Sequence, residues 1–103
     1  MITFEEIKKS HEIKTYIEAS NRVLGAVGYT EHGFAHAMRT ADIAARILRE
    51  TGQEERVCEL AMIAGYMHDI GNAINRADHA QSGGLMAFQI LAHMGFSPEE
   101  TIA

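Results

Sequence analysis

The chain has little of what stabilises secreted or membrane-bound proteins. Its 103 residues include one cysteine, one proline and no tryptophan. A single cysteine, Cys58, cannot form an internal disulfide, which fits a reducing cytoplasm. The apolar stretch around residues 60–67 is far too short to cross a bilayer, and the N-terminus lacks the basic and apolar regions of a signal peptide. We therefore expect one cytoplasmic domain over residues 1–103, with no membrane partner.

Positive charge is also scarce. Nine Lys and Arg residues stand against fourteen Asp and Glu residues, so the net charge is −5. A protein that holds the phosphate backbone of nucleic acid through bulk charge needs an excess of Lys and Arg. Nucleic acid is therefore not an expected partner. A small phosphorylated substrate remains compatible with this balance, because a bound metal ion supplies positive charge locally.

Strand-like alternation of apolar and polar residues is absent, and apolar residues recur with helical spacing instead. We expect an all-α bundle of four to five helices, with an N-terminal helix over 4–27, a core over 30–95 and the start of another helix over 97–103. Thr30 is expected to cap the second helix, Gly28, Gly52, Gly71 and Gly95 to end helices, and 72–79 to form a polar loop. The faces predicted to turn inward are Ile13, Ile17, Ser20, Leu24 and Val27 on the first helix, Phe34, Met38, Ala41, Ala45 and Leu48 on the second, and Val57, Leu60, Ala61, Ala64 and His68 on the third.

The last seven residues carry a strong helix-start signal. Ser97 suits the N-cap, Pro98 the first helical position and Glu100 the third. Barely one turn follows, and an isolated helix that short is not stable in water. We therefore expect this helix to lack room to form and the chain to be a fragment of a longer parent, with a bundle incomplete at its C-terminus. The alternative is a frayed tail.

The feature that carries chemistry is the pair His68-Asp69, which ends an apolar run and is followed by Ile70 and Gly71. Imidazole and carboxylate are common ligands of first-row transition metals. Neither belongs at the end of an apolar run unless something compensates for its desolvation, and a bound cation would do so. His36 lies in the preceding helix, so two packed helices could supply three ligands to an open metal site. The alternative is that both histidines are core residues satisfied by hydrogen bonds.

These residues resemble the HD-domain superfamily of metal-dependent phosphohydrolases, in which a helical histidine precedes a helix that ends in His-Asp-Ile/Leu-Gly. The matching segments are His36–Ala41, Tyr66–Asn72 and Asp78–Gly83, within about residues 30–97. The resemblance implies an HD-like bundle in which His36, His68 and Asp69 bind a divalent metal ion. Asp69 could also bridge to a second ion held by His79. Such mixed ligands suit Mn, Fe, Co, Ni or Zn, and Mg less well.

The resemblance further implies hydrolysis of a small phosphorylated or nucleotide-like compound by a metal-activated water, with Asp69 and His79 in catalytic roles. Arg39 shares the face of His36 and could bind a phosphoryl oxygen, with a surface ion pair as its alternative. Asn72 stands where many members carry a lysine and is expected near the substrate. His32, four residues before His36, could line the site or lie in solvent.

One departure from the family pattern motivates other interpretations. The family completes its first metal site with an aspartate on a later helix, and no Asp follows Asp78 in this chain. We therefore expect the 103 residues alone to be inactive, with an exposed apolar surface and a tendency to form a homo-oligomer. One alternative is an HD-type module that binds a metal or ligand without turnover. Another is a metal-free helical interaction protein.

Overall fold

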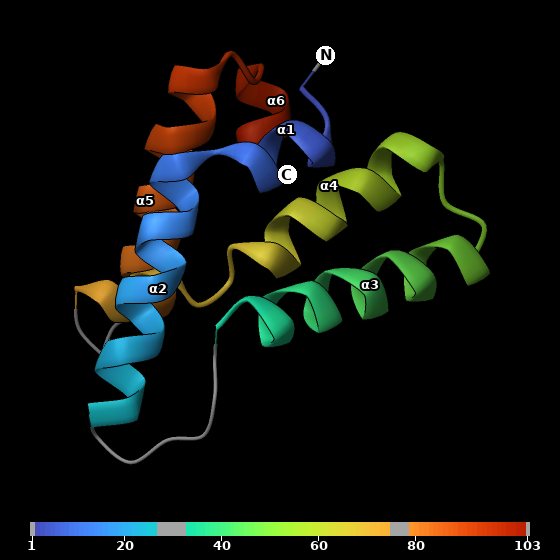
Figure 1. The fold of residues 1–103 in the computed structure, drawn as a ribbon. Helices are drawn as coiled ribbons and strands as arrows, with labels where there is room; N and C mark the ends of the chain where they lie inside the picture. Colours follow the sequence, from blue (N-terminus) through green and yellow to red (C-terminus); the bar gives the residue numbers. More distant parts are fainter. Residues whose placement is uncertain (1, 27–32, 75–78, 103) are drawn as a thin grey trace.

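The structure is a computed structural model that describes residues 2–26, 33–74 and 79–102. These residues form six α-helices and one 3-10 helix and contain no strand, so the all-α prediction is confirmed. In chain order the elements are α1 (Phe4–Lys9), α2 (His11–Ala26), α3 (Phe34–Glu50), α4 (Glu55–Tyr66), the 3-10 helix η1 (Ile70–Ala73), α5 (His79–Met94) and α6 (Pro98–Ile102) (Figure 1). None of the helices in these ranges is long and apolar enough to cross a membrane. The roles expected for Val27, Gly28, Thr30, His32 and Asp78 fall outside the described residues.

The N-terminal segment is not the single helix expected over 4–27. It is divided at Ser10, whose backbone is extended with ψ of 117°. The side chain of Ser10 explains the division, because its Oγ accepts a hydrogen bond of 3.2 Å from the backbone N–H of Ile13, as an N-cap residue does. The bend lets α1 pack on α4 while α2 packs on η1.

The face predicted for α2 is the one that the structure buries. Its buried residues are Ile13, Ile17, Ser20 and Leu24. The first two belong to a core that also contains Phe4 of α1 and Tyr66 of α4. The rings of Phe4 and Tyr66 meet edge to face, with centroids 5.5 Å apart, a favoured geometry for aromatic pairs. The N-terminal helices therefore cover the end of α4 from which the His-Asp pair follows.

α3 and α4 run side by side in opposite directions (Figure 1), and small residues allow them to approach closely. The buried residues of α3 are Ala37, Ala41 and Ala45. Opposite them, a Cβ added at Gly65 of α4 would lie only 3.1 Å from the backbone oxygen of Thr40. The contact is close to the limit that side chains permit, so it fixes the separation of the two helices near His36.

The structure corrects the inward face predicted for α4 and, at Phe34 alone, the one predicted for α3. Phe34 of α3 is 38% exposed, Val57 of α4 is 40% exposed, and Ala64 is also exposed. The buried residues of α4 are instead Cys58, Ile63, Gly65 and Tyr66. The reason is that α4 turns this second face toward α3 and α1. The predicted face of α4 lines an open groove that is described below.

The segment after α4 also differs from the prediction. α4 ends at Tyr66 rather than at Gly71, and part of the expected 72–79 loop belongs to η1. Gly71 serves close packing instead. A Cβ there would collide with the backbone oxygen of His79 and lie 2.5 Å from the backbone nitrogen of Gly83. Glycine at this position therefore lets the first turn of α5 rest directly on η1. Gly52 and Gly95 do follow the ends of helices, with φ of 85° and 110°.

The C-terminal helix α6 forms, so the expectation that it lacked room to do so is wrong. The Ser97 Oγ accepts a 3.3 Å hydrogen bond from the Glu100 N–H, as the capping signal predicted. The Glu100 carboxylate also accepts two hydrogen bonds from Arg56 of α4, of 2.8 and 2.9 Å. Arg56 further donates to Glu59 and to the backbone oxygen of Ile2. Tertiary contacts thus supply the stability that five residues of helix lack alone.

We predict that Gly71→Ala destabilises the fold while Gly84→Ala does not. The added methyl at position 71 must push the backbone of α5 away from η1, and such overpacking costs about 1–3 kcal/mol or more. A Cβ at Gly84 meets nothing within 4 Å, so the helix propensity of alanine should stabilise that variant by up to about 1 kcal/mol. Urea unfolding of both variants measures the difference. Equal stabilities would contradict the close packing at Gly71.

A second prediction concerns acid. Hydrogen bonds from Arg56 hold the pKa of Glu100 below its usual value. A lowered folded-state pKa contributes stability above the unfolded value of about 4.3, and this contribution disappears as the pH falls through the folded pKa. Between about pH 6 and pH 3 the wild type should therefore lose more stability than Glu100→Gln. Glu99→Gln, on the exposed side of α6, should follow the wild type. Parallel melting curves for all three proteins would contradict the prediction.

Candidate metal centre

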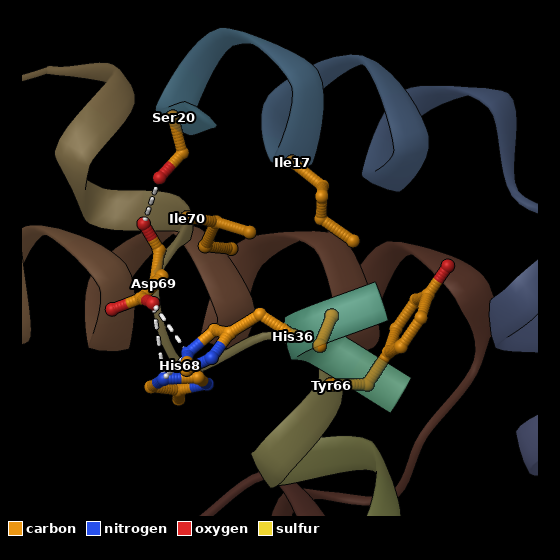
Figure 2. Close-up of a pocket in the computed structure, with 8 residues that line it drawn as sticks. Ile17, Ser20, His36, Tyr66, His68, Asp69 and Ile70 are labelled. Atoms are coloured by element: carbon orange, nitrogen blue, oxygen red, sulfur yellow. Dashed lines mark hydrogen bonds and ion pairs between the residues drawn. The ribbon is translucent and has the colours of Figure 1, made fainter. Parts of the chain in front are cut away.

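Three side chains from separate parts of the chain meet at one point. His36 comes from α3, and His68 and Asp69 come from the turn between α4 and η1. The two Nε2 atoms are 3.2 Å apart, and they lie 3.2 and 3.0 Å from Oδ2 of Asp69. Figure 2 shows both imidazoles directed at this carboxylate. The structure therefore brings together the three residues that the sequence suggested as ligands.

The donor atoms fit a single cation. All three lie within 4.8 Å of one another. Donors that share one transition-metal ion at about 2.1 Å are separated by roughly 3–3.5 Å, close to the distances found between these atoms. Beside them is a cavity of about 10 Å³, bounded by His36, His68 and Asp69 and also by Ile17 and Ser20 of α2. A cavity of that size holds about one water molecule or one ion.

A third histidine, His79, lies near the same carboxylate and follows Asp69 in the sequence. It is the first residue of α5, and its Nε2 lies 4.0 Å from Oδ1 of Asp69. One oxygen of Asp69 thus faces His36 and His68, and the other faces His79. A carboxylate can bridge two metal ions when each of its oxygens faces a separate set of ligand residues, as the two oxygens of Asp69 do here.

The tautomer of His68 follows from its backbone contact. Its Nδ1 lies 2.6 Å from the carbonyl oxygen of Gly65, and a carbonyl oxygen can only accept, so Nδ1 donates. Nε2 is then left for a ligand, in the way that second contacts commonly orient metal-binding histidines. The hydrogen bond with Asp69 raises the pKa of His68, and burial opposes that rise. A proton therefore competes with a metal ion for His68.

The two residues expected near the substrate differ in their placement. Arg39 is exposed, one turn after His36 on α3, and no ion pair with another described residue was found for it. Its contact with a substrate stays a prediction. Asn72 is only 1% exposed, and its Nδ2 lies 3.0 Å from the backbone oxygen of Asp69. A substrate cannot reach so buried an amide, so the structure corrects this expectation: Asn72 supports Asp69 from the interior.

A larger groove of about 660 Å³ lies between α4 and α5 and extends to His68. Its walls are mainly apolar and include Val57, Leu60, Ala61, Ala64, Met67, Ala87, Phe88 and Leu91. The face of α4 that the sequence predicted to be buried is thus the wall of this groove. Phe88 is 44% exposed there. The expected exposed apolar surface is therefore present, next to the candidate metal centre.

Comparison with known proteins agrees with this geometry. The family model of the HD domain matches residues 33–103. The chain belongs to the HD domain family. HD domains form a superfamily of metal-dependent phosphohydrolases, and the matched segment includes His36, His68 and Asp69. α1 and α2 precede the matched segment.

The chain also resembles an uncharacterized protein of Methanocaldococcus jannaschii. The two are 26% identical over 106 residues, which cover 88% of this chain and 41% of that protein. The chain thus spans less than half the length of this relative. No solved structure gives a significant match to the chain.

The sequence analysis missed one residue of the centre. Ser20 was placed on the inward face of the first helix, but its hydroxyl donates a hydrogen bond of 2.6 Å to the backbone oxygen of Asp69. A signal was available, because a hydroxyl among buried aliphatic side chains needs a partner. Which partner it finds could not be read from the sequence, since 49 residues separate the two positions.

The raised pKa of His68 predicts that metal binding weakens in mild acid. A ligand must lose its proton to bind, so affinity should fall about tenfold per pH unit once the pH is below the pKa, which lies above the usual 6.5. Titration of the metal-free protein with Co²⁺ between about pH 8 and pH 5.5 measures this. His11→Ala, on the exposed surface of α2, should follow the wild type. An affinity independent of pH would contradict ligation by His68.

Proposed function

We propose that this protein is a metal-dependent phosphohydrolase that acts on a small phosphorylated or nucleotide-like compound. The observation that carries the proposal is the arrangement around Asp69. His36 and His68 lie within 3.2 Å of one carboxylate oxygen, and His79 faces the other. Membership of the HD domain family supports the same reaction class.

Different residues of the chain would have different roles in this reaction. His36, His68 and Asp69 would hold a divalent ion, and Asp69 and His79 would share a second. The ion, when bound, lowers the pKa of a water molecule and polarises the phosphoryl oxygen. If it does not hold a second ion, His79, whose Nε2 faces Asp69, would instead orient the attacking water or accept its proton. Arg39 lies one turn from His36 and would bind a phosphoryl oxygen.

The proposed ligands indicate a class of metal ions. Two or three imidazoles with one carboxylate suit Mn, Fe, Co, Ni or Zn, whereas Mg prefers oxygen ligands. We propose one or two ions from this set. Elemental analysis by mass spectrometry, on protein purified without chelators, would identify them. A cytoplasmic location belongs to the same proposal, on the ground of the single, buried Cys58.

A second candidate is an HD-type module that binds a metal or ligand without turnover. Its support is the number of ligands. The candidate metal-binding group among the described residues has three members. The family resemblance implies a further ligand, an aspartate on a later helix, and the sequence contains no Asp after Asp78. Under this second candidate, we propose that the 103 residues alone show little or no turnover for this reason. The apolar groove between α4 and α5 favours self-association, which sedimentation would detect.

The test is the pair His68→Ala and Asp69→Ala. Both should abolish hydrolysis of generic phosphomonoesters and phosphodiesters and lower bound metal at least about tenfold, because ligation is their role. Far-ultraviolet circular dichroism should stay nearly unchanged. His93→Ala is the matched control, since His93 is an exposed histidine of α5 that does not line the centre.

Three outcomes separate the candidates. Turnover that disappears with the ligands supports the phosphohydrolase. Metal that disappears with the ligands from a protein without turnover supports the silent module. Retained turnover, or no bound metal in the wild type, contradicts a role of these residues as a metal centre.

A further inference from the structure

The carbonyl oxygen of Asp69 is held by an unusual number of donors. The backbone N–H and the side-chain Nδ2 of Asn72 both donate to it, each at 3.0 Å. Ser20 of α2 adds a third hydrogen bond of 2.6 Å. A carbonyl oxygen has two lone pairs, so three donors leave it little freedom to turn. The peptide after the Asp69 side chain is therefore fixed in place from two different helices.

The hydroxyl of Ser20 has no evident packing purpose. Ser20 is 1% exposed and shares its helix face with Ile13, Ile17 and Leu24. Removing a hydroxyl from water is unfavourable unless a hydrogen bond compensates for it, and an alanine would fill nearly the same space. The bond to Asp69 is the compensation, and it spans 49 residues of sequence.

The direction of the Asp69 carboxylate depends on this peptide. The orientation of the carbonyl sets the backbone around the Asp69 Cα, and so the direction in which the side chain leaves it. Its two oxygens must meet His36 and His68 on one side and His79 on the other. A rotation of the peptide would move both oxygens together. Figure 2 shows Ser20 above Asp69 and the imidazoles on the far side of the carboxylate.

We propose that Ser20 is a positioning residue of the metal centre. From α2, which precedes the segment 33–103 matched by the HD family model, its hydroxyl holds the Asp69 peptide so that the carboxylate faces both ligand histidines. α2 is then a part of the centre and not only a cover for the core. This inference rests on the proposed metal-binding function.

The test is the affinity of the metal-free protein for Co²⁺, followed by visible absorption, which also reports the ligand geometry. Ser20→Ala should bind Co²⁺ about tenfold more weakly, the lower end of the effect seen when a residue behind a metal ligand is removed, and its absorption bands should change. Ser10→Ala is the matched control. It removes the hydrogen bond from the Ile13 N–H at the start of the same helix and should lower the melting temperature without changing the cobalt affinity or spectrum.

The outcomes distinguish this inference from the function on which it rests. If wild type and Ser20→Ala bind Co²⁺ equally, with the same spectrum, Ser20 has no positioning role and the metal centre stands. If Ser10→Ala weakens binding as much as Ser20→Ala, the effect is general stability and the positioning role is overturned. If the wild type binds no Co²⁺, both the proposed metal centre and the positioning role of Ser20 are contradicted.

Discussion

Backbone contact between helices is the constraint on which the centre depends. The imidazole of His36 on α3 can lie within 3.2 Å of that of His68, just after α4, only if the axes of these two helices are close and their register is fixed. Gly65 provides this on α4, where a Cβ would lie 3.1 Å from the Thr40 oxygen. Gly71 does the same between η1 and α5, and so places His79 beside Asp69. Larger residues at these two positions would separate the candidate metal ligands, even though neither glycine belongs to that group.

Asp69 connects these contacts to the chemistry. Its carboxylate is only partly exposed, at 16%, and three imidazoles surround it, so it needs cations or protons nearby to be stable in that environment. The raised pKa of His68, caused mainly by its hydrogen bond with Asp69, is one consequence. The carbonyl of the same residue is held from α2 and from η1. Imidazoles thus surround the carboxylate of Asp69, while hydrogen bonds from Ser20 and Asn72 hold its backbone carbonyl.

The far side of α4 has a different character. It forms one wall of an apolar groove that reaches His68, while Arg56 and Glu100 join α4 to α6 near one end of it. A surface of this kind is rarely left open to water in a monomer. The candidate centre and the groove share His68, so a molecule bound in the groove would also limit access to the centre.

The sequence alone determined the helical class, because a period near 3.6 is a local property that survives without knowledge of partners. It also indicated which residues could bind a metal. His68 and Asp69 end an apolar run, where the loss of hydration of both side chains must be compensated, for example by a bound cation. The capping signal of Ser97 was correct for the same reason: an N-cap acts within one turn.

Tertiary structure decided everything that depends on what lies opposite a helix. Periodicity gave α4 an apolar stripe, but only the position of α3 and α1 shows that its other face, with Cys58 and Ile63, is the buried one. The stability of α6 depends on Arg56, a partner distant in sequence. Ser20 likewise finds its hydrogen-bond partner, the carbonyl oxygen of Asp69, 49 residues away. The physical reason is the same each time: a local pattern specifies which groups must be satisfied, and the packing of distant segments decides which partner satisfies them.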